Sequence, residues 1–180
     1  MSKITATAID MFLRFGFEAT TVRQIAEEAG VSERSMFRYI GSKEEILLAP
    51  LTAQGPELLA ALELCPDTLE PWDALATAFR QLRGFGGSSE QQLALSKMLH
   101  ETPSLRARSA EKHMGWQQLL LPEVRRRMGV APDDLLDPGP AALIASALAC
   151  IDAVGETWMR SGGTLDREAL WARAVAAVRA

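Results

Sequence analysis

Hydroxyl, basic and aromatic side chains recur between residues 21 and 43, and these side-chain types can bind the phosphates and base edges of DNA. An arginine can pair bidentately with guanine, while hydroxyl and ammonium groups bind phosphate oxygens. Helix N-termini in the same stretch add free backbone N–H groups and the positive end of a helix dipole. These chemistries predict DNA contacts by Thr21, Arg23, Ser32, Glu33, Arg34, Ser35, Arg38, Tyr39 and Lys43.

Short helices must position these side chains, and the apolar spacing predicts the first two. One apolar stripe at helical spacing runs over residues 4–15, and Gly16 ends that helix in the pattern of a left-handed C-cap. Thr21 and Gln24 have the spacing of a capping box, which begins a second helix. Gly30 ends the second helix.

A third helix is predicted over residues 33–40, with Ser32 as its N-cap. Because only residues 30–32 separate it from the second helix, the two must cross steeply, as in a helix-turn-helix. In that motif the later helix enters the major groove, so its first residues reach base edges while Arg38 and Tyr39 contact phosphates. A generic helical hairpin is the alternative.

A fourth helix should begin at Lys43, after a second capping-box pattern, and run towards Leu64. Proline removes a backbone donor and clashes with the preceding turn, so Pro50 and Gly55-Pro56 predict a kink or break between Ile46 and Pro56. This segment is either a hinge or ordinary loop punctuation, and the two interpretations stay open.

Glycine, proline and capping residues predict five further helices, which makes about nine in an all-α chain. We expect a three-helix DNA-binding head over residues 1–48 and a helical ligand-binding and dimerisation bundle over residues 49–180. Arg125, Arg126 and Arg127 fall in the last turn of one helix, where cations suit the helix dipole, so they predict no second DNA site. The expected ranges are about 72–83, 88–101, 102–129, 138–161 and 166–179, the fourth being the longest.

The last two expected helices, at 138–161 and 166–179, are long and apolar and end the chain. Small residues such as Ala141, Ala145 and Ala149 would let a partner helix approach closely. We therefore expect a homodimer through this pair of helices. Dimerisation also suits a helix-turn-helix, which reads two half-sites roughly 34–36 Å apart on a palindromic operator.

An effector pocket should be a mostly apolar cavity with a few polar anchors. For the apolar candidates an ordinary core position is the alternative. Two carboxylates four residues apart on one apolar helix either line the pocket or lie at the edge of the bundle. The candidate residues are Phe79, Leu82, Met98, His113, Met114, Trp116, Gln117, Asp152 and Glu156.

Composition limits the classes of function. The net charge is −4, and residues 1–50 hold six basic against seven acidic side chains, so DNA affinity must come from a local basic face. No apolar run approaches 18 residues without a charge, Gly or Pro, so we expect no membrane-spanning segment. Cys65 and Cys150 are solitary and far apart, and we expect both to be reduced thiols in a cytoplasmic protein. His100 and His113 lack the spacing of metal ligands, so we expect no metal, no cofactor and no enzyme. The rival interpretation is a helical ligand-binding dimer without sequence-specific DNA binding.

The stretch FGFEATTVRQIAEEAGVSERSMFRYIGSKEEILLA, Phe15 to Ala49, resembles the DNA-binding domain of the tetracycline-repressor (TetR) family. The resemblance implies a ligand-responsive transcriptional repressor that binds double-stranded DNA as a dimer. It places Arg34 among the variable, base-reading positions. The positions that match the family's DNA contacts are Thr21, Ser35, Tyr39 and Lys43.

Two features depart from the family pattern. Ile40 stands where an aromatic residue is usual, and the basic arm before the first helix is reduced to Lys3. The later part of the chain, at residues 101–108, Trp116 and residues 129–134, is similar to the mycofactocin-regulator-like subgroup. That similarity implies a small, mostly apolar effector of the acyl-CoA type.

Overall fold

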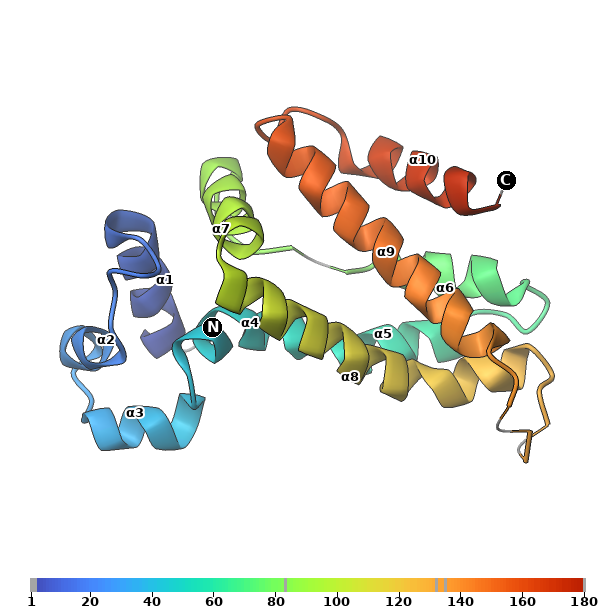
Figure 1. The fold of residues 1–180 in the computed structure, drawn as a ribbon, viewed down its shortest axis with the longest axis horizontal. Coiled ribbons are helices and arrows are strands. Elements are labelled where there is room, and N and C mark those ends of the chain that lie inside the picture. Colours follow the sequence, from blue (N-terminus) through green and yellow to red (C-terminus); the bar gives the residue numbers. More distant parts are fainter. Residues whose placement is uncertain (1–2, 83, 132, 135, 180) are drawn as a thin grey trace. The chain divides into compact units, whose positions relative to one another are not determined.

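The computed structural model describes residues 3–82, 84–131, 133–134 and 136–179, with the side chains of residues 37–40 left out. Regular structure within these ranges is entirely helical, which confirms the all-α fold (Figure 1). The helices of the described ranges are α1 (Lys3–Phe15), α2 (Val22–Ala29), α3 (Glu33–Ile40), α4 (Lys43–Thr52), α5 (Gln54–Glu63), α6 (Pro71–Phe79), α7 (Ser89–Glu101), α8 (Pro103–Arg127), α9 (Gly139–Arg160) and α10 (Arg167–Arg179).

The expected interruption of the fourth helix divides it into α4 and α5, with Ala53 between them. Pro50 lies inside α4, and Pro56 lies in the first turn of α5, where a missing backbone donor costs little. Gly55 is buried, and a Cβ atom at this position would lie 2.9 Å from Cδ1 and Nε1 of Trp116. A glycine is therefore needed where α5 packs closely against α8.

Two expected helix lengths were wrong. The longest helix is α8, with 25 residues, and not α9, which has 22. Pro122 lies inside α8, where it removes one backbone donor from the helix. Helix α6 ends at Phe79 and not near Arg83, because the N–H groups of Gln81 and Leu82 bond to carbonyls three residues back and tighten the chain into turns.

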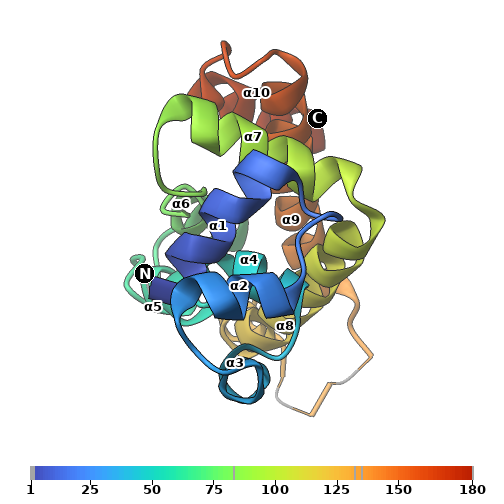
Figure 2. The same cartoon turned by 90° about the vertical axis from the view of Figure 1, so that its left-hand side faces the viewer.

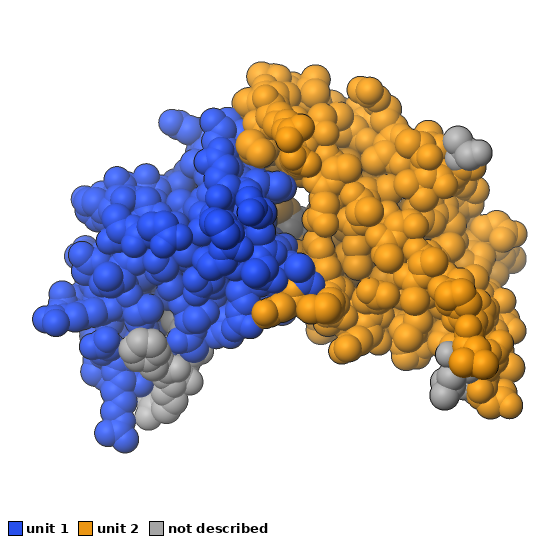
Figure 3. Space-filling view, viewed as in Figure 1, with its two compact units in different colours: residues 1–52, 85–110 blue, residues 53–84, 111–180 orange. Residues whose placement is uncertain are grey.

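Residues 1–52 and 85–110 form one compact unit, here called unit 1 (Figure 3). The predicted head thus shares its unit with α7 and the start of α8. Figure 2 shows α1, α2 and α3, with a short connection between α2 and α3 at which the chain changes direction. Side chains from α1 to α4 and from α7 and α8 make a single core, which includes Phe12, Ile25, Met36, Leu47, Leu95 and Leu105.

Residues 53–84 and 111–180 form the second compact unit, here called unit 2. Helix α9 packs against α10 and α6, and α5 packs against α6. Cys65 and Cys150 are both buried and free. The core of unit 2 includes Leu62, Leu75, Phe79, Trp116, Leu120, Ile144, Leu148 and Trp171.

Candidate functional site

The start of α2 is held by the predicted capping box. The hydroxyl of Thr21 accepts from the backbone N–H of Gln24 at 3.2 Å, and the Gln24 side chain accepts from the N–H of Thr21 at 2.8 Å. Gly30 ends the helix with a φ of 72°, a left-handed conformation that glycine adopts without strain. Both ends of α2 are therefore set by residues within one turn.

Replacing Thr21 by alanine is expected to lower the free energy of unfolding by about 1 kcal/mol, because the first turn of α2 loses its side-chain acceptor. Urea denaturation followed by circular dichroism measures the change. Thr77→Ala is the matched control, because Thr77 is exposed within α6. Equal changes for the two variants would contradict a capping role for Thr21.

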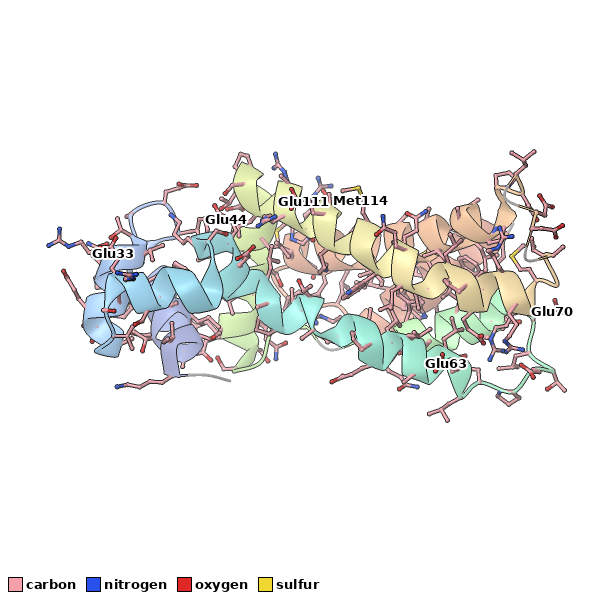
Figure 4. The ribbon with its side chains drawn as sticks, turned by 90° about the horizontal axis from the view of Figure 1, so that it is seen from below. Glu33, Glu44, Glu63, Glu70, Glu111 and Met114 are labelled. Atoms are coloured by element: carbon pink, nitrogen blue, oxygen red, sulfur yellow. The ribbon has the colours of Figure 1, made fainter. Side chains whose placement is uncertain are left out.

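Helix α3 begins with a pair of serines that bond to each other. The hydroxyl of Ser32 accepts from the backbone N–H of Ser35 at 3.2 Å, and the two hydroxyl oxygens lie 2.9 Å apart. Glu33 and Arg34, between them, are exposed, and Figure 4 labels Glu33 at the start of α3. The predicted base-reading end of α3 therefore presents one carboxylate and one guanidinium to solvent.

Two other predicted phosphate contacts on α3, Arg38 and Tyr39, have side chains outside the described residues. Arg23, on α2, donates from Nε to Glu27 at 3.0 Å, and both side chains are exposed. The hydrogen bond from Glu27 raises the pKa of Arg23 above its ordinary value. A phosphate at this position would compete with Glu27 for the guanidinium.

Lys43, at the start of α4, has a partner that the sequence analysis missed. Its ammonium donates to the backbone carbonyl of Phe17 at 2.7 Å and lies 4.2 Å from the centre of the Phe17 ring. An ammonium has three donors, so this contact leaves others for a phosphate. Lys43 thus ties α4 to the chain that follows α1.

The capping box of α4 is also tied to a distant helix. Glu45 accepts from the N–H of Ser42 at 3.1 Å, and Ser42 accepts from the N–H of Glu45 at 3.2 Å. Nη2 of Arg108, on α8, donates to the other carboxylate oxygen of Glu45 at 2.6 Å. Only the folded chain shows this pair, since 63 residues separate its members.

The apolar candidates for the effector site do not all lie together. Phe79 and Trp116 are buried in the core of unit 2, and Leu82 packs against it. Met98 instead packs against the core of unit 1. Met114 is 56% exposed, on the outer side of α8 (Figure 4).

The polar candidates for the effector site also do not all lie together. His113, with a side chain only 13% exposed, places Nδ1 3.4 Å from a carboxylate oxygen of Asp152 on α9. Glu156 is exposed and pairs with Arg160 one turn later at 2.7 Å. Gln117 is half-buried. The structure therefore joins His113 with Asp152, and it places Glu156 in a surface ion pair.

Lys112 lies in the same region, and its role was not predicted from the sequence. Its ammonium lies 4.4 Å from the centre of the Trp116 ring, and the His113 ring lies 5.7 Å from that ring. Burial lowers the pKa of Lys112 to about 8, against the opposing effect of the Asp152 carboxylate. In the sequence, Lys112 could have been noticed because it stands next to His113 and one helical turn before Trp116.

The three arginines that end α8 make internal contacts. Arg125 donates to the carbonyls of Ala131 and Asp134, in the segment that follows α8. Arg126 pairs with Asp67 at 2.7 Å on the surface. Arg127 is different, because its side chain is only 2% exposed. Its guanidinium donates to the carbonyls of Leu62, Cys65 and Pro66 and to the carboxylate of Glu123.

Two family models match the chain. The model described as bacterial regulatory proteins, tetR family, matches residues 4–49, and that of the MftR C-terminal domain matches residues 69–180, which is more than half of the chain. The chain belongs to the TetR family. This confirms the helix-turn-helix over the generic hairpin, and it makes the protein a DNA-binding transcriptional regulator with a ligand-binding C-terminal domain.

Two curated members of the TetR family are similar over nearly the whole chain. The regulator TcmR of Streptomyces glaucescens is 34% identical over 170 residues, which cover 91% of this chain and 74% of TcmR. The putative mycofactocin biosynthesis regulator MftR of Mycobacterium tuberculosis is 28% identical and is covered to 84%. Both are named as transcriptional regulators, as expected for a member of this family.

A solved structure with a similar fold is Thermus thermophilus FadR, a TetR-family repressor in complex with lauroyl-CoA. It is 24% identical, with a TM-score of 0.59 over 96% of this chain and 90% of FadR. The Pseudomonas aeruginosa repressor NalD has a TM-score of 0.57 at 19% identity. Both comparisons show the TetR-family fold.

Proposed function

We propose that the protein represses transcription by binding a palindromic operator as a homodimer, and that a small effector changes its affinity for DNA. The observation that carries the proposal is the pair of exposed side chains, Glu33 and Arg34, at the start of α3. On this proposal residues 1–48 bind DNA and residues 49–180 bind effector and partner. The proposed DNA contacts remain Thr21, Arg23, Ser32, Glu33, Arg34, Ser35, Arg38, Tyr39 and Lys43.

The dimer is proposed to form through α9 and α10. Helix α9 is long and apolar enough, by length and composition, to cross a membrane, and only 28% of that stretch is buried. Its exposed residues include Ala145, Ala149 and Ala153, and those of α10 include Ala172 and Ala176. Helices of a second copy would cover this apolar surface closely, which explains its composition without a lipid environment.

The effector is proposed to be small and mostly apolar, with an acyl-CoA as one candidate. The match of residues 69–180 to the MftR C-terminal domain supports a related effector site. The FadR structure of similar fold contains lauroyl-CoA, which makes acyl-CoA compounds reasonable members of a first panel. Candidate lining residues in unit 2 are Phe79, Leu82, His113, Trp116, Gln117 and Asp152.

Fluorescence anisotropy on DNA fragments selected from the source genome tests the proposal. Binding should fall steeply between about 50 and 200 mM salt, because phosphate contacts release counterions. Arg34→Ala should weaken binding to the selected fragments by about tenfold or more and relax their sequence preference, since a bidentate contact to guanine is lost. Lys43→Ala should weaken binding to all fragments to a similar degree.

Arg14→Ala is the matched control for Arg34→Ala, because Arg14 is an exposed arginine of the same unit, paired with Asp10 on α1. It should leave sequence preference unchanged. Unaltered preference in Arg34→Ala would refute base reading by this residue. A selection that yields no bound fragment would favour a ligand-binding dimer without sequence-specific DNA binding.

A further inference from the structure

A cluster of Lys112, His113 and Asp152 lies beside the buried ring of Trp116 in unit 2. Lys112, His113 and Trp116 share one face of α8, since they are spaced by three and four residues. Asp152 approaches from α9, with its oxygen 3.4 Å from Nδ1 of His113. Glu111 and Met114 are exposed, and Figure 4 shows both on the outer side of the helix.

One nitrogen of this cluster lacks a hydrogen-bond partner within the described part of the chain, and its ammonium group is poorly hydrated. Nε2 of His113 is buried and has no hydrogen-bond partner among the residues that the structure describes. Buried polar atoms of folded proteins normally have such a partner, because leaving one unpaired costs free energy. The Lys112 ammonium lies against an aromatic ring and has lost much of its hydration, as its lowered pKa reflects.

The charges around Lys112 and His113 indicate which kind of ligand would bind there. Within the described part of unit 2, Asp152 is the carboxylate in contact with the cluster, so two basic side chains share one acid. A further cation would be repelled by Lys112. An incoming carboxylate could accept from the ammonium and from a protonated imidazole, and such charge-assisted bonds are the strong ones.

We propose that Lys112 and His113 bind the carboxylate of an acidic effector whose remaining body is apolar. The apolar body would contact the apolar core of unit 2, to which Trp116, the aromatic neighbour of both bases, belongs. This inference rests on the proposed function, because it assigns the effector's polar anchor in the ligand-binding domain. A site of this kind would bind organic acids more tightly than uncharged ligands of the same shape.

Matched pairs of ligands test the choice of an acid. The probes are octanoic, lauric and 1-naphthoic acids, together with the alcohols that share their carbon skeletons. Thermal shift and isothermal titration calorimetry on the full-length protein measure binding. At least one acid should bind, and about tenfold or more tighter than its alcohol, because the neutral alcohol has no anionic oxygens to pair with the ammonium.

Two variants test the residues, and a third is the control. Lys112→Met and His113→Phe should each reduce the preference for the acid by about tenfold. Lys97→Met, at an exposed lysine of α7, should keep the preference of the unaltered protein. Lys112→Met should fold at least as stably as the parent, since it removes a buried charge, so a loss of acid binding would not reflect unfolding.

The outcomes separate this inference from the proposed function. Failure of every acid to bind, equal binding of acids and alcohols, or a preference that survives both variants would each overturn the carboxylate anchor. Operator binding is measured on the same preparations. DNA binding without acid binding would overturn only the carboxylate-binding role of Lys112 and His113. Failure to bind DNA would count against the proposed repressor function.

Discussion

Replacing Arg127 by methionine is expected to lower the free energy of unfolding by about 3 kcal/mol or more. The guanidinium is buried, and it donates to the carbonyl oxygens of Leu62 and Cys65, each at 2.7 Å. These carbonyls lie where α5 ends and the following turn begins. The carbonyl of Leu62 also accepts from the backbone N–H of Cys65 at 3.1 Å, so Arg127 adds a further donor at this helix end. Methionine fills a similar volume but leaves both acceptors without this donor.

Glu123 adds to the expected cost. Its side chain is only 11% exposed and accepts from Nε of Arg127 at 2.8 Å. Hydrogen bonds from Arg126 and then Arg127 lower the pKa of Glu123 below its ordinary value. Loss of Arg127 leaves this largely buried carboxylate with Arg126 alone, which is why the loss should exceed that of an exposed ion pair.

Urea denaturation followed by circular dichroism measures the effect. Arg126→Met and Arg125→Met are matched controls one and two residues away. The side chain of Arg126 is 52% exposed, and Arg125 donates to exposed carbonyls. Both should change stability far less than Arg127→Met. If the three substitutions were equally costly, the three arginines would all be acting as last-turn cations, and the buried contacts of Arg127 would carry no special weight.

Raising the pH from about 8 to about 10.5 is expected to relieve a destabilising charge at Lys112. The pKa of Lys112 is about 8 in the folded protein and 10.5 when the side chain is unperturbed. Between these values the unfolded chain binds more protons than the folded one, so the free energy of unfolding rises with pH. The shift sets an upper limit of about 3 kcal/mol on the gain.

Comparison with Lys112→Met isolates this contribution. Burial raises the pKa of Cys150, and a thiol that stays protonated in the folded state makes stability fall as pH rises in the same range. Both proteins contain Cys150, so the difference between their stabilities cancels its effect. The variant should be the more stable at pH 7, and its advantage should shrink towards pH 10.5. A difference that does not change with pH would contradict a charged, buried Lys112.

The beginning and end of the early helices were determined by the sequence alone. Thr21 and Gln24 form the capping box that their spacing predicts, and Gly30 takes the left-handed conformation. Such signals can be interpreted from a sequence because donor and acceptor lie within one helical turn. The family resemblance of residues 15–49 is local in the same sense, and the match over residues 4–49 confirms it.

Contacts between distant parts of the chain could be decided only by the tertiary structure. Arg127 resembles its two neighbours in sequence, yet it alone of the three lies against Leu62 and Cys65, more than 60 residues earlier. Met98, a pocket candidate by type, packs instead against the core of unit 1. Helical periodicity predicts that a face is buried, but not which helix covers it, because many helices offer similar apolar faces.

The same distinction applies to the two proposed sites. The sequence determined that a helix-turn-helix is present and which side chains stand at the start of its second helix, since turn and caps are local. The pairing of His113 with Asp152, and the burial that lowers the pKa of Lys112, depend on how α8 packs beside α9. Hydration and charge at a buried group are set by neighbours from other helices, so only the tertiary structure decided them.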